Sequence, residues 1–452
     1  MPQDIAVRTI PCFLIFGAYI YNMKYIPIDK ALYIQNRQNF ILQMKPNSMA
    51  IFLSNDEMPS NADQFHPFKQ NSDLLYLSGI DQEDTILLLY PDSPNPKYRE
   101  ALFLKKTNDY IAVWEGHKYT EQEARDASGI ETIHWNDEFA GLFHMLSNHA
   151  EHIYLNSNEN DRAIIKVDTK EIRFAGEVRT HYPLHKLERS APIMASLRTA
   201  KSKWEKAALQ TACDITEKAF KRLLGFVKPG VTEYEIEAEI THEFLRNRAT
   251  GHAYSPIIAS GDSACVLHYV DNNKACNAGE LILMDFGAGY ANYCADLTRT
   301  IPVNGKFTER QKDVYNAVLR VQKEAINMMH PGMILREFNA EVGKVMEAEL
   351  KQLGLISEQD IKNQDPELPA YKKYFMHGTG HYLGLDVHDI GDHYKPVPVG
   401  AVLTCEPGIY IREEGIGIRI ENDVMLMQTG NHDFMQNTPR EVEEIEAMMN
   451  AK

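Results

Sequence analysis

Two aspartates lie where a folded chain would bury them. Asp285 falls within the apolar run LILMDFG (281–287), and on a strand it would share one face with Leu281 and Leu283. Asp296 follows 11 residues later, in a second strand-like run after a glycine-rich turn. A hairpin would bring the two carboxylates side by side, where they repel unless a cation lies between them. Buried charges are usually paired or bind metal, so the pair predicts a cation site. The alternative is an exposed hairpin end with ordinary acids.

The second half of the chain carries a faint internal repeat. Four features recur in one order: a helix ending at Pro-Gly, a histidine, a glycine that opens an apolar strand, and an acid six residues after that glycine. They are Pro229-Gly230, His268, Gly279 and Asp285 in the first copy, and Pro331-Gly332, His388, Gly400 and Glu406 in the second. Chance agreement is the alternative, but the shared order and spacing favour a duplicated unit.

The repeat predicts a second pair of acids and, with them, a metal centre. Glu421, in the run 416–427, follows Glu406 by 15 residues, and Asp296 follows Asp285 by 11. A histidine from HGTGHYLGLDVHDIG (377–391) adds an imidazole. The five candidate ligands are Asp285, Asp296, His381, Glu406 and Glu421. Four carboxylates balance two divalent ions, and oxygen donors with one imidazole suit Mn(II), Mg(II), Co(II), Fe(II) or Zn(II). Paired metals about 3.5–4 Å apart are typical of aminopeptidases and phosphatases.

Three further histidines lie in the same segments as these candidate ligands: His268, His377 and His388. A lone histidine is more often structural, but three beside one site favour hydrogen-bond donors to a substrate carbonyl or a tetrahedral oxyanion. Arg419 precedes Glu421 by two residues on the same strand face. We expect it first to pair with a ligand carboxylate.

The elements that must position these residues can be outlined along the chain. Residues 31–190 have an α/β pattern, with strand-like runs at 50–53 and 85–90 and no dense cluster of reactive residues. The segment 189–196 (RSAPIMAS) is expected to be a linker. A helical pattern then runs from Ser202 to the Pro-Gly at 229–230, and capping-box spacing begins another helix near residue 232. The predicted division is an uncertain extension at 1–23, an amino-terminal domain at 24–192 and a catalytic domain at 193–452.

Composition narrows the class of protein. The 452 residues are 44% hydrophobic and 24% charged, which is ordinary for a soluble globular protein of more than one domain. A formal charge of −16 argues against a nucleic-acid binder, which needs a basic face. None of the six cysteines forms a C-x-x-C pair, so reduced thiols and a cytoplasmic location are expected.

The extreme amino terminus is ambiguous. The stretch from Ile10 to Tyr21 is apolar, but its 12 residues are too few to span a bilayer. It has the length of a signal-peptide core, yet no good small-residue cleavage site follows it. We favour Met23 as the true start, over a signal or anchor and over a structured extension. No membrane association is expected.

These residues resemble a known family. Five segments of the carboxy-terminal half are similar to the pita-bread metallopeptidases of family M24B, the group of Xaa-Pro aminopeptidase, prolidase and methionine aminopeptidase. They are SGDSACVLHY (260–269), LILMDFGAGYANYCADLTRT (281–300), FMHGTGHYLGLDVHD (375–389), LTCEPGIYI (403–411) and GIGIRIENDV (415–424). FKQNSDLLYLSGI (68–80) resembles the amino-terminal domain of Xaa-Pro aminopeptidases, and EEIEAMM (443–449) resembles their ending. Cys405 is a small departure, because an apolar β-branched residue is usual there.

The resemblance implies a mixed α/β (α+β) fold. A pita-bread catalytic domain with an internal pseudo-twofold duplication would follow a smaller α/β domain of the creatinase and aminopeptidase P type. The family's ligand set falls on all five residues above. It implies two divalent ions, with manganese favoured and zinc, cobalt or iron as alternatives, and attack by a metal-bridging hydroxide on the bond before a proline at position two.

The resemblance also implies residue roles. Glu406 would accept a proton and pass it to the leaving proline nitrogen. His268 and His388 would contact the substrate or oxyanion, and His377 would shape the proline pocket. Asp285 would help bind the free amino group, and Trp114 would border the site from the amino-terminal half. A tryptophan filling that domain's core is the alternative for Trp114.

Rival functions remain open at this point. Prolidase shares every metal ligand and differs by a basic group that binds the free carboxylate of a dipeptide. Methionine aminopeptidase would not need the long amino-terminal half. Non-catalytic or creatine-hydrolysing relatives typically lose ligands, and a phosphatase would need a phosphate cradle. The expected partners are peptides with proline at position two and further copies of the chain, as a dimer or tetramer.

Overall fold

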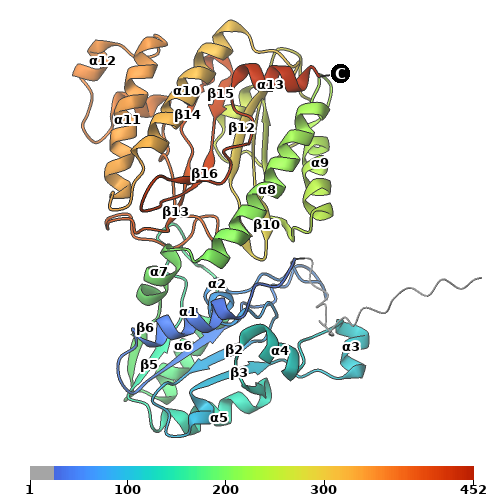
Figure 1. Cartoon of the computed structure of the whole chain (residues 1–452), viewed down its shortest axis with the longest axis vertical. Coiled ribbons are helices and arrows are strands. Elements are labelled where there is room, and N and C mark those ends of the chain that lie inside the picture. The colour runs from blue at the N-terminus through green and yellow to red at the C-terminus, as the bar shows by residue number, and fades with distance from the viewer. Residues whose placement is uncertain (1–24, 452) are drawn as a thin grey trace, which may run out of the picture.

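The computed structural model describes residues 25–451 of the chain. The predictions about Ile10 to Tyr21 and a start at Met23 concern residues outside this range. The described chain forms an amino-terminal part around one six-stranded sheet and a larger carboxy-terminal part, joined by α7 (Ala191–Thr199) (Figure 1). No helix within residues 25–451 is long and apolar enough to cross a membrane.

The sheet of the amino-terminal part has the strand order β4-β3-β2-β1-β5-β6. The strands are β1 (Ser48–Leu53), β2 (Ile86–Leu89), β3 (Glu100–Leu104), β4 (Thr132–Trp135), β5 (His152–Leu155) and β6 (Lys186–Arg189). Every residue of β1 is buried, because β2 and β5 flank it and helices cover both faces. The strands predicted at 50–53 and 85–90 are therefore confirmed as β1 and β2.

Helices cover the two faces of this sheet through alternate residues of β1. Phe143 of α5 (Phe139–Ser147) and Val178 of α6 (Lys170–His181) pack against Met49 and Ile51. The opposite face is covered by α1 (Ala31–Ile41), α2 (Ser72–Ser78) and α4 (Glu121–Ser128). The short α3 (Asp109–Glu115) contains no buried residue.

The segment 189–196 is not the irregular linker that its Ser-Ala-Pro composition suggests. Most of it belongs to α7, whose second residue is Pro192. Proline is tolerated in the first helical turn because the backbone N–H groups there have no helical partner. Met194 is fully buried in an apolar cluster that continues from the amino-terminal part into the carboxy-terminal part. The connection is therefore a packed element.

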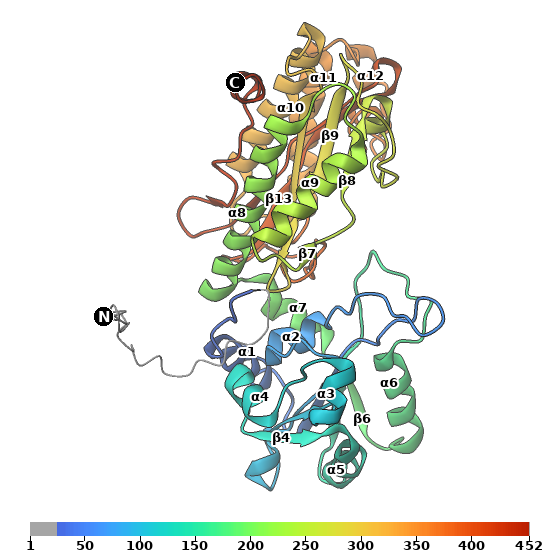
Figure 2. The ribbon, with the colours of Figure 1, turned by 90° about the vertical axis from the view of Figure 1, so that its right-hand side faces the viewer.

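In the carboxy-terminal part, strands lie between two pairs of helices (Figures 1 and 2). The pairs are α8 (Lys203–Phe226) with α9 (Glu233–Arg246), and α10 (Glu309–Met328) with α11 (Leu335–Gln352). Two three-stranded sheets carry the candidate site, β8-β9-β12 and β13-β16-β17. Their strands are β8 (Ile257–Ser260), β9 (Leu281–Phe286), β12 (Leu297–Pro302), β13 (Val402–Cys405), β16 (Asn422–Met425) and β17 (His432–Asp433). The remaining elements are β7 (Gly251–His252), β10 (Ala288–Tyr290), β11 (Tyr293–Cys294), α12 (Glu358–Lys362), β14 (Gly408–Ile411), β15 (Ile416–Arg419) and α13 (Val442–Met449).

The two halves of the carboxy-terminal part match in backbone detail. Gly230 after α8 and Gly332 after α10 have φ of +92° and +89°. Each donates its N–H to a carbonyl of the segment that leads into β9 or β13, at 2.9 and 2.8 Å respectively. Gly279 and Gly400, which open β9 and β13, have φ of +89° and +88°. These conformations favour glycine. The predicted internal duplication is confirmed, with two equivalent units of helix pair and sheet.

Candidate active site

The strands β9 and β12 position the first pair of acids. Their antiparallel register sets Asp285 opposite Thr298, and a further hairpin of β10 and β11 lies between them. The hydroxyl of Tyr254 lies 2.5 Å from Oδ1 of Asp285 and 2.5 Å from Oδ1 of Asp296. Both aspartates are buried. The structure thus brings the two carboxylates together through a longer connection than one simple hairpin.

Glycine is required where the chain passes between these aspartates. A β-carbon at Gly287, directly after β9, would lie 1.7 Å from the carbonyl oxygen of Ala295. Moving a backbone oxygen away from such a contact would cost much free energy, so only glycine allows the two segments to lie this close. This contact fixes the residue before Asp296 against the end of β9.

The strands β13 and β16 position the second pair of acids. Cys405 pairs with Asn422, so Glu406 and Glu421 lie directly beyond the paired ends. The hydroxyl of Thr298 donates to Oε2 of Glu421 at 2.6 Å, and the N–H of Glu421 donates to the carbonyl of Thr298 at 3.1 Å. These bonds join the second sheet to the first at the acids.

The imidazole of His381 completes the group. Its Nδ1 lies 3.0 Å from the carbonyl oxygen of Tyr382, which places the proton on Nδ1 and leaves Nε2 as a ligand atom. Nε2 lies 3.5 Å from Oδ2 of Asp296 and 3.7 Å from Oε1 of Glu406. A β-carbon at the preceding Gly380 would lie 2.1 Å from the carbonyl oxygen of Thr404, so the loop lies directly against β13.

The assembled donors fit divalent cations. One donor atom each of Asp296, His381 and Glu421 lies within 4.8 Å of the others, and Asp285 and Glu406 adjoin them. Burial raises the pKa of Glu406 to about 7 and also raises the pKa of Asp285 and of Glu421. Three buried carboxylates and the partly buried Glu406, beside one guanidinium, need further positive charge. Oxygen donors with one imidazole accept hard or borderline divalent ions.

Arg419 lies against the first pair of acids, on β15. Its Nη2 forms an ion pair with Oδ2 of Asp285, and its Nε donates to Oγ1 of Thr298 at 3.0 Å. Its Nη1 donates to the hydroxyl of Tyr410 at 2.8 Å. The guanidinium therefore orients a candidate ligand, as the spacing from Glu421 suggested.

His377 lies on the far side of Tyr410 from Arg419. Its Nε2 is 2.8 Å from the Tyr410 hydroxyl, and its Nδ1 is 2.7 Å from the carbonyl oxygen of Gly378. Burial, and then the charge of Arg419, lowers the pKa of His377 to about 3. The ring is neutral at pH 7 and lies 3.8 Å from the carboxylate of Glu406.

His388 and His268 are the exposed members of the histidine group. The ring of His388 lies edge-on to that of His381, with centroids 4.3 Å apart. Burial, and then the charge of His381, lowers the pKa of His388 to about 4, and His268 acts in the same direction on both His377 and His388. His268 therefore lies within electrostatic reach of both other histidines.

Four residues that the sequence pattern did not single out support the candidate ligands. Tyr254 contacts both aspartates, Thr298 and Tyr410 are described above, and Asp423 accepts the N–H of Asp296 at 2.9 Å. Asp423 lies two residues after Glu421 on β16, so strand alternation could have indicated it. The tyrosines come from segments whose spacing gives no signal.

A cavity of about 1010 Å³ opens beside His381 and His388. Its walls include the loop 156–165 of the amino-terminal part and α7. Trp114 is not among the residues that line it, and its side chain on α3 is 77% exposed. Trp114 thus neither borders this site within one chain nor fills the core, because α3 packs none of its residues inward.

Two family models match the chain. Metallopeptidase family M24 matches residues 207–428, and the aminopeptidase P amino-terminal domain matches residues 33–154. A metallopeptidase cleaves peptide bonds with bound metal, so the chain is a metal-dependent hydrolase that acts on peptides.

Individual relatives extend the match over more than nine-tenths of the chain. The Xaa-Pro aminopeptidase of Escherichia coli is 33% identical over 93% of this chain and 98% of its own length. Pseudomonas aeruginosa aminopeptidase PepP superposes with a TM-score of 0.85 at 30% identity, covering 94% of this chain and 98% of the other. A zinc-substituted E. coli aminopeptidase P in complex with product gives a TM-score of 0.83 at 30% identity, covering 94% and 99%. The chain belongs to the Xaa-Pro aminopeptidase (aminopeptidase P) family of the M24 metallopeptidases.

Proposed function

We propose that the chain releases the amino-terminal residue from peptides with proline at position two. Asp285, Asp296, His381, Glu406 and Glu421 would hold two divalent ions, with manganese as the proposed metal. The observation that carries this proposal is the convergence of these five donors, from both units of the duplication, beside a cavity of about 1010 Å³. When bound, the ions would supply an activated water nucleophile and polarise the substrate carbonyl.

Glu406 is the carboxylate best placed to move a proton. Its side chain is 20% exposed, compared with 6% for Asp296 and 12% for Asp285. It is therefore more accessible than these two aspartates, and it can take a proton from the attacking water. It can then give that proton to the departing proline nitrogen.

The histidines would bind the substrate around the scissile bond. His388, which lines the cavity, and His268 are both exposed and can donate to a carbonyl or to the developing oxyanion. His377 is held by Tyr410 and Gly378, so its ring forms a fixed wall beside Glu406. That wall suits the rigid proline ring, whose nitrogen offers no N–H for recognition.

The amino-terminal part favours the aminopeptidase over prolidase, since its match is to the aminopeptidase P amino-terminal domain. The chain keeps all five ligand residues, which argues against the non-catalytic alternative. We also propose the division into an amino-terminal domain at 24–192 and a catalytic domain at 193–452. The cytoplasmic location and the homo-oligomeric state stay predictions.

The test is a cleavage assay on Mn(II)-loaded protein with Ala-Pro-Ala, Ala-Pro and Ala-Ala. Cleavage of Ala-Pro-Ala, lost in Asp285→Asn and in Glu406→Gln, is the expected result. Cleavage of Ala-Pro alone would reassign the enzyme as a prolidase. Absence of Xaa-Pro cleavage by folded, metal-loaded protein would overturn the proposed function.

A further inference from the structure

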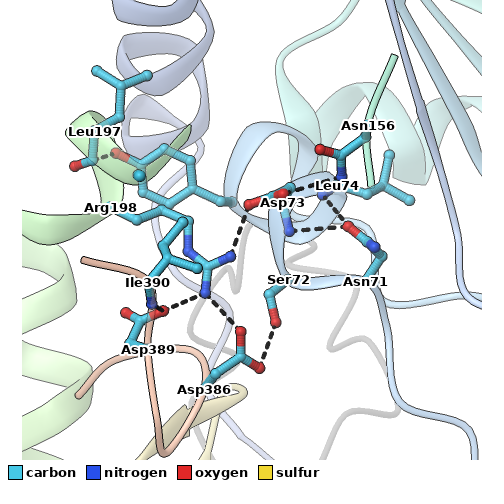
Figure 3. A network of polar contacts seen from close by, with 12 residues as sticks. Asn71, Ser72, Asp73, Leu74, Asn156, Leu197, Arg198, Asp386, Asp389 and Ile390 are labelled. Atoms are coloured by element: carbon cyan, nitrogen blue, oxygen red, sulfur yellow. Dashed lines mark hydrogen bonds and ion pairs between the residues drawn. The ribbon is translucent and has the colours of Figure 1, made fainter. Parts of the chain in front are cut away.

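One arginine joins three aspartates at the boundary between the two parts of the chain. Arg198, the penultimate residue of α7, donates from Nη1 to Oδ1 of Asp73 at 2.7 Å. Its Nη2 donates to Oδ2 of Asp386 at 2.8 Å and also binds Oδ1 of Asp389 (Figure 3). Asp73 belongs to α2 and the other two to the loop after His381, so one guanidinium links both parts.

The centre of the group is buried, and its two cations hold three carboxylates. The side chain of Arg198 is 4% exposed, and those of Lys201 and Asp389 are each 1% exposed. Nζ of Lys201 donates to Oδ2 of Asp389 at 2.8 Å, so each oxygen of that carboxylate is held by a different cation. Buried charges of this kind hold a fixed geometry, because each is costly to leave unpaired.

The loop held in this way carries His388. Asp386 and Asp389 bracket it, and the N–H of Asp389 donates to the carbonyl of Tyr382 at 2.9 Å. The carbonyl of His388 itself accepts from Nδ2 of Asn160, at 3.1 Å. The imidazole of His388 is exposed and touches the ring of His381 edge-on, so its position depends on the backbone that carries it.

Further hydrogen bonds hold the residues of this network that belong to the amino-terminal part of the chain. Ser72 and Asp73 lie in the first turn of α2, and the side chain of Asn71 caps that turn by accepting from the N–H groups of Asp73 and Leu74 at 3.1 Å. The hydroxyl of Ser72 donates to Oδ1 of Asp386 at 2.9 Å (Figure 3). The segment 68–80 therefore contacts the His388 loop directly.

We propose that Arg198 is a positioning residue for His388, tying its loop to the amino-terminal part so that the imidazole keeps its place beside His381. The kinetic test of this role rests on the proposed function, whereas the exchange test below does not. The amino-terminal part then takes part in catalysis by holding a catalytic-domain loop, without supplying a reacting group.

A double-mutant cycle tests whether Arg198 acts through His388. Arg198→Gln is expected to lower kcat/KM for Ala-Pro-Ala by about 100-fold, mostly in kcat, since small misplacements of a reacting group have effects of that size. In a His388→Ala background the same change is expected to cost less than about threefold. Arg198→Lys should recover only part of the loss, because an ammonium cannot bridge two carboxylates as a guanidinium does. Equal losses in both backgrounds would overturn the proposal.

Hydrogen exchange tests the same role without activity. The amides of Asp389 and Ile390 are expected to exchange at least about tenfold faster in Arg198→Gln than in the unmodified protein. Arg37→Gln is the matched control, because Arg37 is similarly buried but binds Glu100 and the carbonyls of Leu77 and Ser128, none of which belongs to the His388 loop. Unchanged exchange in Arg198→Gln, or an equal rise in Arg37→Gln, would overturn the proposal.

If Arg198→Gln does not fold, Asp73→Asn replaces it. This variant leaves the catalytic domain intact and removes only the amino-terminal end of the network. It should show a smaller kcat loss with the same dependence on His388, and faster exchange at residues 389 and 390. Failure of the unmodified protein to cleave any Xaa-Pro peptide would refute the proposed function alone, and the exchange result would still decide the role of Arg198.

Discussion

The hydroxyl of Thr298 lies 2.6 Å from Oε2 of Glu421, so a residue of the first duplicated unit holds an acid of the second. The same oxygen accepts from Nε of Arg419 at 3.0 Å. Because a hydroxyl has one proton, these two contacts fix its direction: the proton goes to Glu421 and the lone pair faces the guanidinium. One small side chain therefore orients an acid and an arginine together.

Replacing Thr298 by valine should weaken metal binding without unfolding the protein. The shapes match, but Glu421 loses a donor, and loss of such outer contacts typically costs 10- to 100-fold in metal affinity. Titration calorimetry with Mn(II) measures the change. Thr211→Val is the control, because its hydroxyl only bonds the carbonyl of Ala207 on α8. Equal Mn(II) affinities for the two variants would contradict the role given to Thr298.

Two glycine-to-alanine changes should have opposite effects on stability. Gly287→Ala forces a β-carbon against the Ala295 carbonyl and should destabilise the fold by about 2 kcal/mol or more. Gly225→Ala meets no atom within 4 Å, lies in α8, and should stabilise by about 0.5–1 kcal/mol. Urea unfolding compares them. Similar effects of both changes would show that the close approach at Gly287 is not needed.

Glu171 should make stability depend on pH. Burial, and then the charge of Asp73, raises the pKa of Glu171 to about 7. A carboxyl group whose pKa is raised by folding keeps its proton in the folded state, so folding stability falls as pH rises from about 4.5 to about 7. Glu171→Gln removes this cost, and its gain over the unmodified protein should be roughly 2–3 kcal/mol larger at pH 8.5 than at pH 4.5.

Urea unfolding at the two pH values measures the Glu171 effect. The amide of glutamine can still accept from Asn71 and Asn156, which each donate to Glu171 at 3.0 Å. Glu177→Gln on the exposed side of α6 is the control and should show the same difference from the unmodified protein at both pH values. A pH-independent gain for Glu171→Gln would contradict the prediction.

Metal removal should lower thermal stability through the five candidate ligands. An ion that binds only the folded state stabilises it by about 2.7 kcal/mol at a concentration 100 times Kd. The Tm should therefore fall when EDTA is added, and Mn(II) should restore it. Glu421→Gln should lose this response, whereas Glu414→Gln, which removes only the surface pair with Arg310, should keep it. A metal response that survives in Glu421→Gln would remove that residue from the set.

The candidate acids and the duplication could be predicted from the sequence because both follow from strand geometry. Asp285 and Glu406 each fall six residues after a glycine that the fold needs in a left-handed conformation, so the spacing is imposed by the backbone. Asp296 and Glu421 lie directly before β12 and β16, the strands that pair with β9 and β13. The first unit still differs from a simple hairpin, since β10 and β11 lengthen it.

Other features of the site and fold could not be predicted from the sequence, because they depend on contacts between segments far apart in the chain. Tyr254 touches two aspartates 31 and 42 residues away, and no local pattern marks it. Arg198 meets Asp73 and Asp389 over separations of 125 and 191 residues. The helix α7 was missed because its composition suits both a linker and a helix start, and only the burial of Met194 decides between them.

The duplication also sets the order in which the protein can mature. Each unit supplies one carboxylate pair, and Thr298 must meet Glu421 across 123 residues of chain. During synthesis the amino-terminal part can fold first, since its sheet is complete by Arg189. The ion-binding group stays unfinished until Glu421, near the carboxy terminus, has been made. Metal capture by the five proposed ligands is therefore expected only after Glu421 has been made, and shortened nascent chains should not take up the ions.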